Sequence, residues 1–130
     1  MAFAYDVVSP ERKLASGEAD AVQIPGAEGD LTAMPNHAPF LTTLRPGVVK
    51  VRSGSETTEF VVTGGFVEIS PESAAVLAEE AVTPSEADAA WFAAKIEAVE
   101  ALHEAAEGEA KIILAQRIND FRFLQAQLGA

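Results

Sequence analysis

Apolar and polar residues alternate with a period of two along the first 83 residues. Phe3, Tyr5 and Val7 fall on one face of an extended chain, and the same alternation recurs at Val49 and Val51. Further segments rich in Val, Ile and Phe lie at 22–24, 60–62, 66–69 and 75–81. This period, in short runs of these residue types, predicts β-strands.

Turn-forming residues separate the expected strands at short intervals. They are Ser9-Pro10, Ser16-Gly17, Pro25-Gly26, Pro46-Gly47, Ser53-Gly54-Ser55, Gly64-Gly65 and Ser70-Pro71. Nothing between them has the length and period of a crossover helix, which argues against a parallel α/β sheet. Short strands at this spacing favour an antiparallel sandwich or barrel.

The pattern changes at Thr83, where Thr83-Pro84-Ser85-Glu86 predicts the start of a helix with Thr83 as its cap. Two apolar stripes at helical spacing follow and are separated at Gly108. The first contains Trp91, Lys95, Ala98 and Leu102 with Phe92, Ile96 and Val99 beside them, and the second contains Leu114, Ile118, Phe121, Gln125 and Leu128. We therefore expect an antiparallel β-sandwich over residues 1–83 and an antiparallel α-helical hairpin over residues 84–130.

Composition narrows the classes of function. A chain of 130 residues is one domain, or one domain with an appendage, and can bury a core. Its net charge of −11 repels nucleic acids and anionic lipid surfaces. No basic residue precedes Arg12 and no apolar run approaches the length of a bilayer span. We expect a soluble cytoplasmic protein that reaches a membrane only through a partner.

A stiffened segment, residues 24–46, carries the side chains best suited to chemistry or to contacts. Its backbone is restricted or bent at Pro25, Gly26, Gly29, Pro35, Pro39 and Pro46. One interpretation is a small β-sandwich enzyme or sugar-binding module that uses His37 with Glu28 or Asp30 for acid–base work. The other is a docking surface. No nucleophile or oxyanion hole accompanies His37, which favours the second interpretation.

Other motifs argue against a bound metal or cofactor. Glu28 and Asp30 are too few carboxylates for a calcium loop, and the chain has no Cys to supply a thiolate ligand. The glycine-rich segment 62–66 lacks the Gly-x-x-x-x-Gly-Lys-Ser/Thr pattern and leads into an expected strand. We expect no catalytic residue, no metal and no cofactor.

With these features in place, the chain resembles a known family, the epsilon subunits of F-type ATP synthases. The matching stretches follow the family's order over the first 81 residues. They are Asp6-Val-Val-Ser-Pro-Glu, Gly17, Pro25-Gly-Ala-Glu-Gly-Asp-Leu, Asn36-His-Ala-Pro-Phe-Leu-Thr, Pro46-Gly-Val-Val, Thr63-Gly-Gly-Phe-Val-Glu-Ile and Val76-Leu-Ala-Glu-Glu-Ala. The hairpin matches in length and placement more than in motif.

The resemblance implies a ten-stranded β-sandwich followed by two helices, in a non-catalytic subunit of the rotating central stalk. It implies contacts with the gamma subunit and with the ring of membrane c subunits. The positions that match the c-ring side are Glu28, Gly29, Asp30, Asn36 and His37, and those on the gamma side are Ser9 and Thr42. The subunit would lie on the cytoplasmic side of the inner (plasma) membrane, held there by its partners without inserting.

The resemblance also implies a regulatory role for residues 84–130. In the family the hairpin lies folded on the sandwich or opens along gamma towards the alpha and beta subunits, where it blocks ATP hydrolysis. Some members bind ATP through an acid-x-x-Arg-Ala sequence, but here Trp91 follows Asp88 at the Arg position, so we expect no useful ATP affinity. The second helix has only three basic residues, Lys111, Arg117 and Arg122, and we expect mild inhibition.

Overall fold

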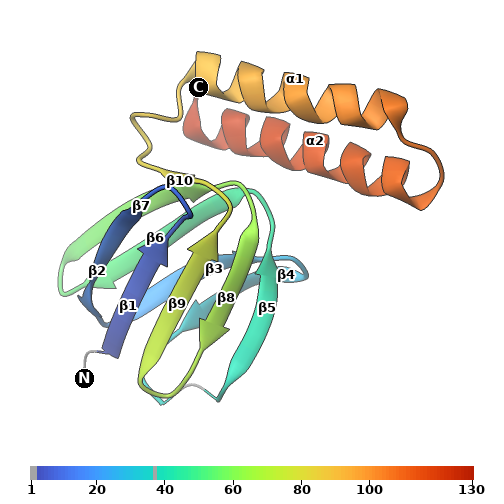
Figure 1. Cartoon of the computed structure of the whole chain (residues 1–130). Coiled ribbons are helices and arrows are strands. Elements are labelled where there is room, and N and C mark those ends of the chain that lie inside the picture. The colour runs from blue at the N-terminus through green and yellow to red at the C-terminus, as the bar shows by residue number, and fades with distance from the viewer. Residues whose placement is uncertain (1–2, 37) are drawn as a thin grey trace. The chain divides into compact units, whose positions relative to one another are not determined.

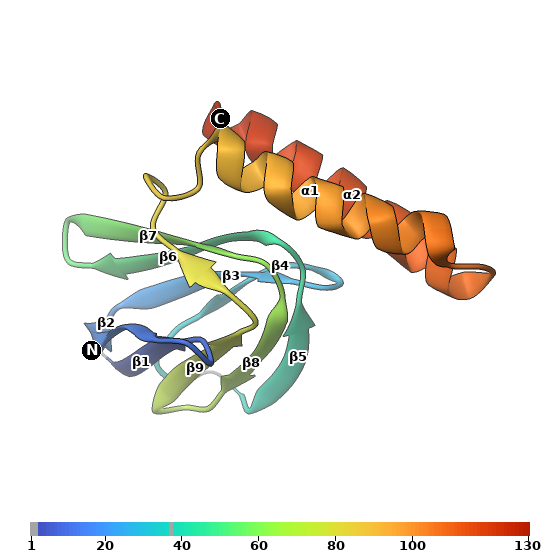
Figure 2. The same ribbon diagram turned by 45° about the horizontal axis from the view of Figure 1, so that its top comes forward.

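The structure is a computed structural model that describes residues 3–36 and 38–130, and it divides the chain into two compact units. The first unit ends at Thr83 and holds the strands, whereas the second begins at Pro84 and holds two helices (Figures 1 and 2). The main apolar cluster of the strands is built entirely from residues of the first unit. The expected sandwich followed by a helical hairpin is confirmed.

Ten strands form one sheet that folds over on itself (Figure 2). They are β1 (Phe3–Val8), β2 (Lys13–Ala19), β3 (Ala21–Gly26), β4 (Gly29–Ala33), β5 (Phe40–Leu44), β6 (Gly47–Ser53), β7 (Glu56–Val62), β8 (Gly65–Ile69), β9 (Ser73–Ala78) and β10 (Ala81–Val82). Neighbouring strands follow the order β10-β7-β6-β3-β5-β8-β9-β1-β2, and β4 pairs with β3. The described pairs are antiparallel except β1 with β9, where Val7 lies beside Val76.

Alternation along the strands places one set of side chains in the core. Val49 and Val51 of β6 are buried, and so are Val67 and Ile69 of β8. Full burial of an aliphatic side chain of this size contributes about 1.5–3 kcal/mol. The period of two in the sequence therefore marks the face of each strand that stabilises the sandwich.

One of the expected turns lies inside a strand, and another marks the end of a strand. Gly17 is within β2 opposite Tyr5, and a Cβ at Gly17 would lie 3.6 Å from the tyrosine ring. Gly26 ends β3, and a Cβ there would lie 2.7 Å from the carbonyl oxygen of Gly29. The prediction of a turn at Ser16-Gly17 is therefore wrong, whereas Pro25-Gly26 directly precedes the turn at Ala27 and Glu28.

The second unit consists of α1 (Ala89–Ala105) and α2 (Glu109–Leu128), which lie side by side and antiparallel (Figures 1 and 2). Asp88 caps α1, and its carboxylate accepts a hydrogen bond from the backbone N–H of Trp91 at 2.9 Å. The predicted start at Thr83 is wrong, since residues 84–87 form a turn before the helix. An Asp in the N-cap position satisfies a helix N–H that would otherwise lack a partner.

Apolar side chains join the two helices. The buried ones are Phe92 and Val99 of α1 and Ile118, Phe121 and Leu124 of α2. The ring of Trp91 lies edge-on to Phe92, with centroids 4.9 Å apart, and 6.4 Å from Phe121. Leu102, expected on the first stripe, is 60% exposed, so the buried line of α1 runs through Phe92 and Val99 instead.

Candidate docking surfaces

The hairpin between β3 and β4 presents an exposed tip, which we define as Ala27, Glu28, Gly29 and Asp30. Gly26 pairs with Gly29, so the chain reverses over Ala27 and Glu28. Gly29 has φ of 143°, a conformation that disfavours any side chain. The tip is therefore an ordered turn of a β-hairpin with its polar groups in solvent, whereas the sequence suggested a longer loop.

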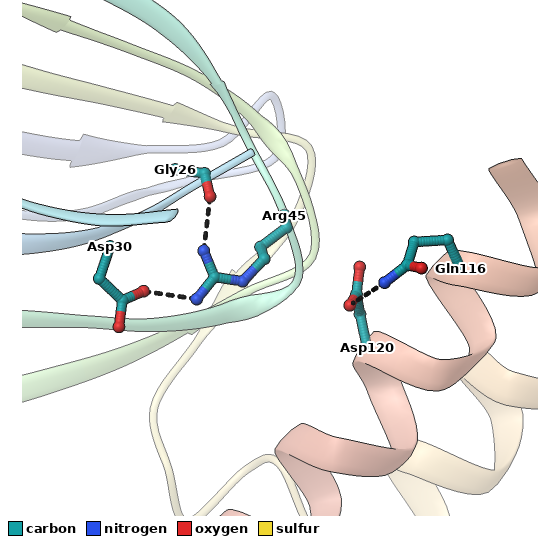
Figure 3. A network of polar contacts seen from close by, with 5 residues as sticks. All are labelled: Gly26, Asp30, Arg45, Gln116 and Asp120. Carbon is teal, nitrogen blue, oxygen red and sulfur yellow. Dashed lines mark hydrogen bonds and ion pairs between the residues drawn. The ribbon is translucent and has the colours of Figure 1, made fainter. Parts of the chain in front are cut away.

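Arg45 holds this tip against the chain between β5 and β6. Its guanidinium donates one hydrogen bond to the carbonyl oxygen of Gly26 and another to the carboxylate of Asp30, with which it forms an ion pair (Figure 3). The backbone N–H of Arg45 also donates to the carbonyl of Pro25 at 3.0 Å. The carboxylate of Asp30 is thus engaged within the protein.

Asn36 lies at the opposite end of β4 from the tip. Its φ is 68°, and its N–H donates to the carbonyl of Pro71, in the turn before β9, at 2.9 Å. Because β4 rises about 3.3 Å per residue, Asn36 is several residue lengths from Asp30. Glu28, Gly29 and Asp30 come together, but Asn36 does not join them. His37 lies outside the described residues.

An apolar patch lies on the outward face of β5, β8 and β9. Phe66 on β8 is paired with Leu77 on β9, and Leu41 on β5 is paired with Glu68, two residues along β8 from Phe66. The exposed fractions are 65% for Leu41, 53% for Phe66 and 50% for Leu77. We call Leu41, Phe66 and Leu77 the outer patch, because exposed apolar groups in a cluster are typical of interaction sites.

The outer patch has a signal in the sequence. Phe66-Val67 and Val76-Leu77 are pairs of consecutive large apolar residues within strands. A strand with one face in solvent normally places a polar residue at every second position. Two apolar residues in a row therefore indicate that both faces of the sheet become covered.

Neither Ser9 nor Thr42, expected on the gamma side, is part of the outer patch: Thr42 pairs with the buried Val67, so it points away from the face that carries Leu41. Ser9 follows β1, and Thr42 is next to Leu41 in β5. The hydroxyl of Ser9 donates to the carbonyl of Arg12 at 3.2 Å, and the residue is only 9% exposed. Ser9 therefore offers little surface of its own, and the outer patch offers more.

The basic residues of α2 are engaged in different ways. Arg122 forms an ion pair with Glu100 of α1 at 3.2 Å, and the guanidinium of Arg117 lies 5.4 Å from the ring centroid of Phe121. Lys111 and Arg122 line a hollow of about 550 Å³ between the helices. The three cations therefore do not form one continuous basic surface.

The outer face of α2 combines apolar and polar groups. Ile112, Ile113 and Phe123 are 71%, 61% and 72% exposed. Between them, the side-chain amide of Gln116 donates to the carboxylate of Asp120, one turn further along, at 3.0 Å (Figure 3). This face offers apolar side chains for a further contact.

Trp91 fills the position where a nucleotide-binding Arg was expected. Lys95 lies 5.4 Å from its ring centroid, and the two phenylalanine rings pack against it. Its Nε1 is buried and makes no hydrogen bond among the described residues. Asp88, the acid of the same sequence, is used as a helix cap.

Two further kinds of site concern the described part of the chain, metal centres and membrane spans. No group of three or more His, Cys, Asp or Glu side chains could hold a metal ion there. Neither described helix is long and apolar enough to cross a membrane.

Known proteins match this chain along most of its length. A family model for the beta-sandwich domain of the ATP synthase delta/epsilon chain covers residues 2–84. The ATP synthase epsilon chain of Rhodobacter capsulatus is 44% identical over 125 residues, 96% of this chain and 95% of that protein. The epsilon chain of Ruegeria sp. (strain TM1040) is 54% identical over 103 residues, 79% and 75% of the two chains.

Solved structures show the same fold. A chain in the cryo-EM structure of the Euglena gracilis mitochondrial ATP synthase, OSCP/F1/c-ring, matches with a TM-score of 0.75, covering 98% of this chain and 81% of that one. The two sequences are 22% identical, so this likeness concerns the fold alone. These matches do not favour an enzyme or sugar-binding module built on Glu28, Asp30 and His37.

Proposed function

This chain belongs to the ATP synthase delta/epsilon chain family, and on that premise we propose that it is a central-stalk subunit of an F-type ATP synthase. In this role it transmits rotation and performs no chemistry itself. The match to the Rhodobacter capsulatus epsilon chain carries the proposal, because it extends over both the sandwich and the hairpin.

The outer patch is suited to bind the gamma subunit. Leu41, Phe66 and Leu77 lie on adjacent strands of one rigid sheet, so a partner can cover all three together. Each Å² of apolar surface removed from water contributes about 25 cal/mol, so three large side chains supply a useful share of the binding free energy.

The tip of the β3–β4 hairpin is suited to meet the polar loops of the c ring. A contact that transmits torque must be rigid. In this tip the hydrogen bonds of Arg45 and the backbone conformation at Gly29 fix the turn. Asn36, at the other end of β4, would make a separate contact with the ring. The subunit is then a peripheral protein on the cytoplasmic side of the membrane, held through its partners.

The hairpin of residues 84–130 is suited to a regulatory contact with the alpha and beta subunits. The exposed face of α2 supplies apolar groups for it. The basic side chains of α2 contribute less to this contact, because Arg122 is paired with Glu100 and Arg117 lies against an aromatic ring. Inhibition of ATP hydrolysis by this hairpin is therefore mild. The packing around Trp91 supports the absence of useful nucleotide binding.

The proposed function can be tested by removing this chain from the ATP synthase and adding the purified chain back. Membrane vesicles with the ATP synthase lacking this chain should hydrolyse ATP with little proton pumping, and the purified full-length chain should restore pumping per ATP hydrolysed. Vesicles that keep their own copy serve as the control and should not respond to added chain. A chain that neither binds the depleted complex nor restores pumping would contradict the proposal.

A further inference from the structure

We propose that Arg45 is a positioning residue for the tip of the β3–β4 hairpin, and that Asp30 acts as the anchor for Arg45 and not as a contact to the partner. The inference rests on the proposed function, in which this tip docks on the rotor. It adds a residue that the resemblance did not indicate and reassigns the role of Asp30.

The side chain of Arg45 spans the base of the tip. One of its terminal nitrogens reaches the carbonyl of Gly26, on β3, and the other reaches the carboxylate of Asp30, on β4 (Figure 3). A planar guanidinium can satisfy two acceptors at once in a fixed geometry, which an ammonium group cannot do. Arg45 therefore ties the two strands of the hairpin together and to its own turn.

Backbone contacts reinforce the same junction. The N–H of Arg45 donates to Pro25, and the N–H of Ala27 donates to the carbonyl of Thr43 at 2.9 Å. A Cβ at Gly47 would lie 2.5 Å from the Cβ of Pro25, so the chain after Arg45 is packed closely on β3. The tip projects from a base that is fixed on two sides.

The exposure of Arg45 and Asp30 indicates that their ion pair positions the tip without adding much to the stability of the fold. The side chains of Arg45 and Asp30 are 32% and 57% exposed, and ion pairs so near the surface contribute little to the free energy of unfolding. Loss of the pair should leave the fold intact. It should nevertheless free the tip to move, since the side-chain tie between its two strands is lost.

Glu28 differs from Asp30 in this respect. It is exposed, and no hydrogen bond or ion pair of its carboxylate is found among the described residues. Glu28 can therefore face a partner directly, whereas Asp30 faces Arg45. This contrast makes Glu28 a control for contacts that do not involve Arg45.

The experiment measures ATP-driven proton pumping per ATP hydrolysed in vesicles that carry the assembled enzyme with variants of this chain. Arg45→Gln should lower the ratio, because the guanidinium that ties the two strands of the tip is lost, and Arg45→Lys should recover part of it. Asp30→Asn should lower the ratio, and the double variant should be no worse than Arg45→Gln alone. Glu28→Lys tests docking of the tip itself.

A second readout uses nuclear magnetic resonance of the isolated full-length chain. Fast backbone motion at residues 27–30 should increase in Arg45→Gln, while the melting temperature stays within a few degrees of the parent. A residue with a purely structural role would lower the melting temperature without loosening these amides selectively.

Three results would overturn the inference. If the losses from Arg45→Gln and Asp30→Asn add, Asp30 touches the partner directly. If Arg45 variants pump normally while Glu28→Lys fails, the tip docks but needs no positioning, and the proposed function stands. If none of the variants affects pumping, the tip does not dock at all. Failure of the parent chain to co-purify with the enzyme would instead contradict the proposed function.

Discussion

Phe66 on β8 lies directly opposite Leu77 on β9, and both side chains are about half exposed on the outward face of the sheet. Cross-strand pairs of this kind usually contribute to a sheet by contact with each other and by burial. Here much of their surface remains in solvent, and the adjacent strand adds Leu41 to the same face.

Replacement of Phe66 by Ser should weaken binding to the gamma subunit about tenfold, because a large apolar contact is lost from the interface. The melting temperature of the free chain should change little, since the side chain is half exposed. Met34→Ser is the matched control, because Met34 is 49% exposed in the same unit but outside the outer patch. Equal binding by both variants would show that gamma does not use this face.

A chain that ends at Thr83 should fold cooperatively and bind gamma. The apolar cluster of the sandwich contains no residue beyond Ala81, so removal of the helices takes nothing from it. Circular dichroism on heating and a binding assay with gamma provide the measurements. An unfolded fragment would mean that the sandwich depends on the helices.

Asp88→Ala should destabilise the helical hairpin by about 1 kcal/mol, because the N–H of Trp91 loses its acceptor. At about 2.1 cal/mol/K of unfolding entropy per residue, the unit of residues 84–130 should lose roughly 10 °C in the melting temperature followed at 222 nm. Asp88→Asn keeps an acceptor at the same place and should behave like the parent. A similar loss in both variants would assign the effect to charge and not to capping.

Calorimetry of the purified full-length chain with ATP should show no useful affinity. Trp91 offers one donor and no charge where an Arg would offer five donors and a full charge, and Asp88 is already used by the helix. Titration with a nucleotide-binding member of the family provides the positive control. Binding at micromolar concentration or below would refute this prediction.

Deletion of residues 84–130 should raise ATP hydrolysis by the assembled enzyme only modestly. Glu100→Gln should act in the opposite direction and deepen inhibition, because it releases Arg122 from its ion pair. Glu97→Gln, on the same helix, is a control for the change of net charge alone. A large burst of hydrolysis on deletion would contradict mild inhibition.

The sequence predicted element types better than their boundaries. The period of two marked the buried faces of the strands because burial depends on side-chain alternation, which any β-strand shares. Gly17 was misjudged because a glycine inside a strand looks, in sequence, like one that permits a turn. The start of α1 was misplaced because Thr83 and Asp88 are both suitable cap residues, and the helix begins after Asp88.

The candidate surfaces depended on pairings that no local pattern reveals. Glu28 and Asp30 are neighbours in sequence, but only the structure shows that Arg45, 15 residues after Asp30, engages one of them. The outer patch likewise joins residues from β5, β8 and β9, which become adjacent only through strand order. Asn36 seemed close to Asp30 in sequence, but an intervening strand carries it to the opposite end.

The parallel pairing of β1 with β9 has a consequence for the order in which the protein is made. The first strand leaves the ribosome early, yet its neighbour on one side, Val76 beside Val7, is synthesised almost 70 residues later. At ribosomal speeds of 5–20 residues per second, this is a wait of roughly 4–14 s. Throughout that interval β1 can pair only with β2, and its other edge stays open until β9 has been made.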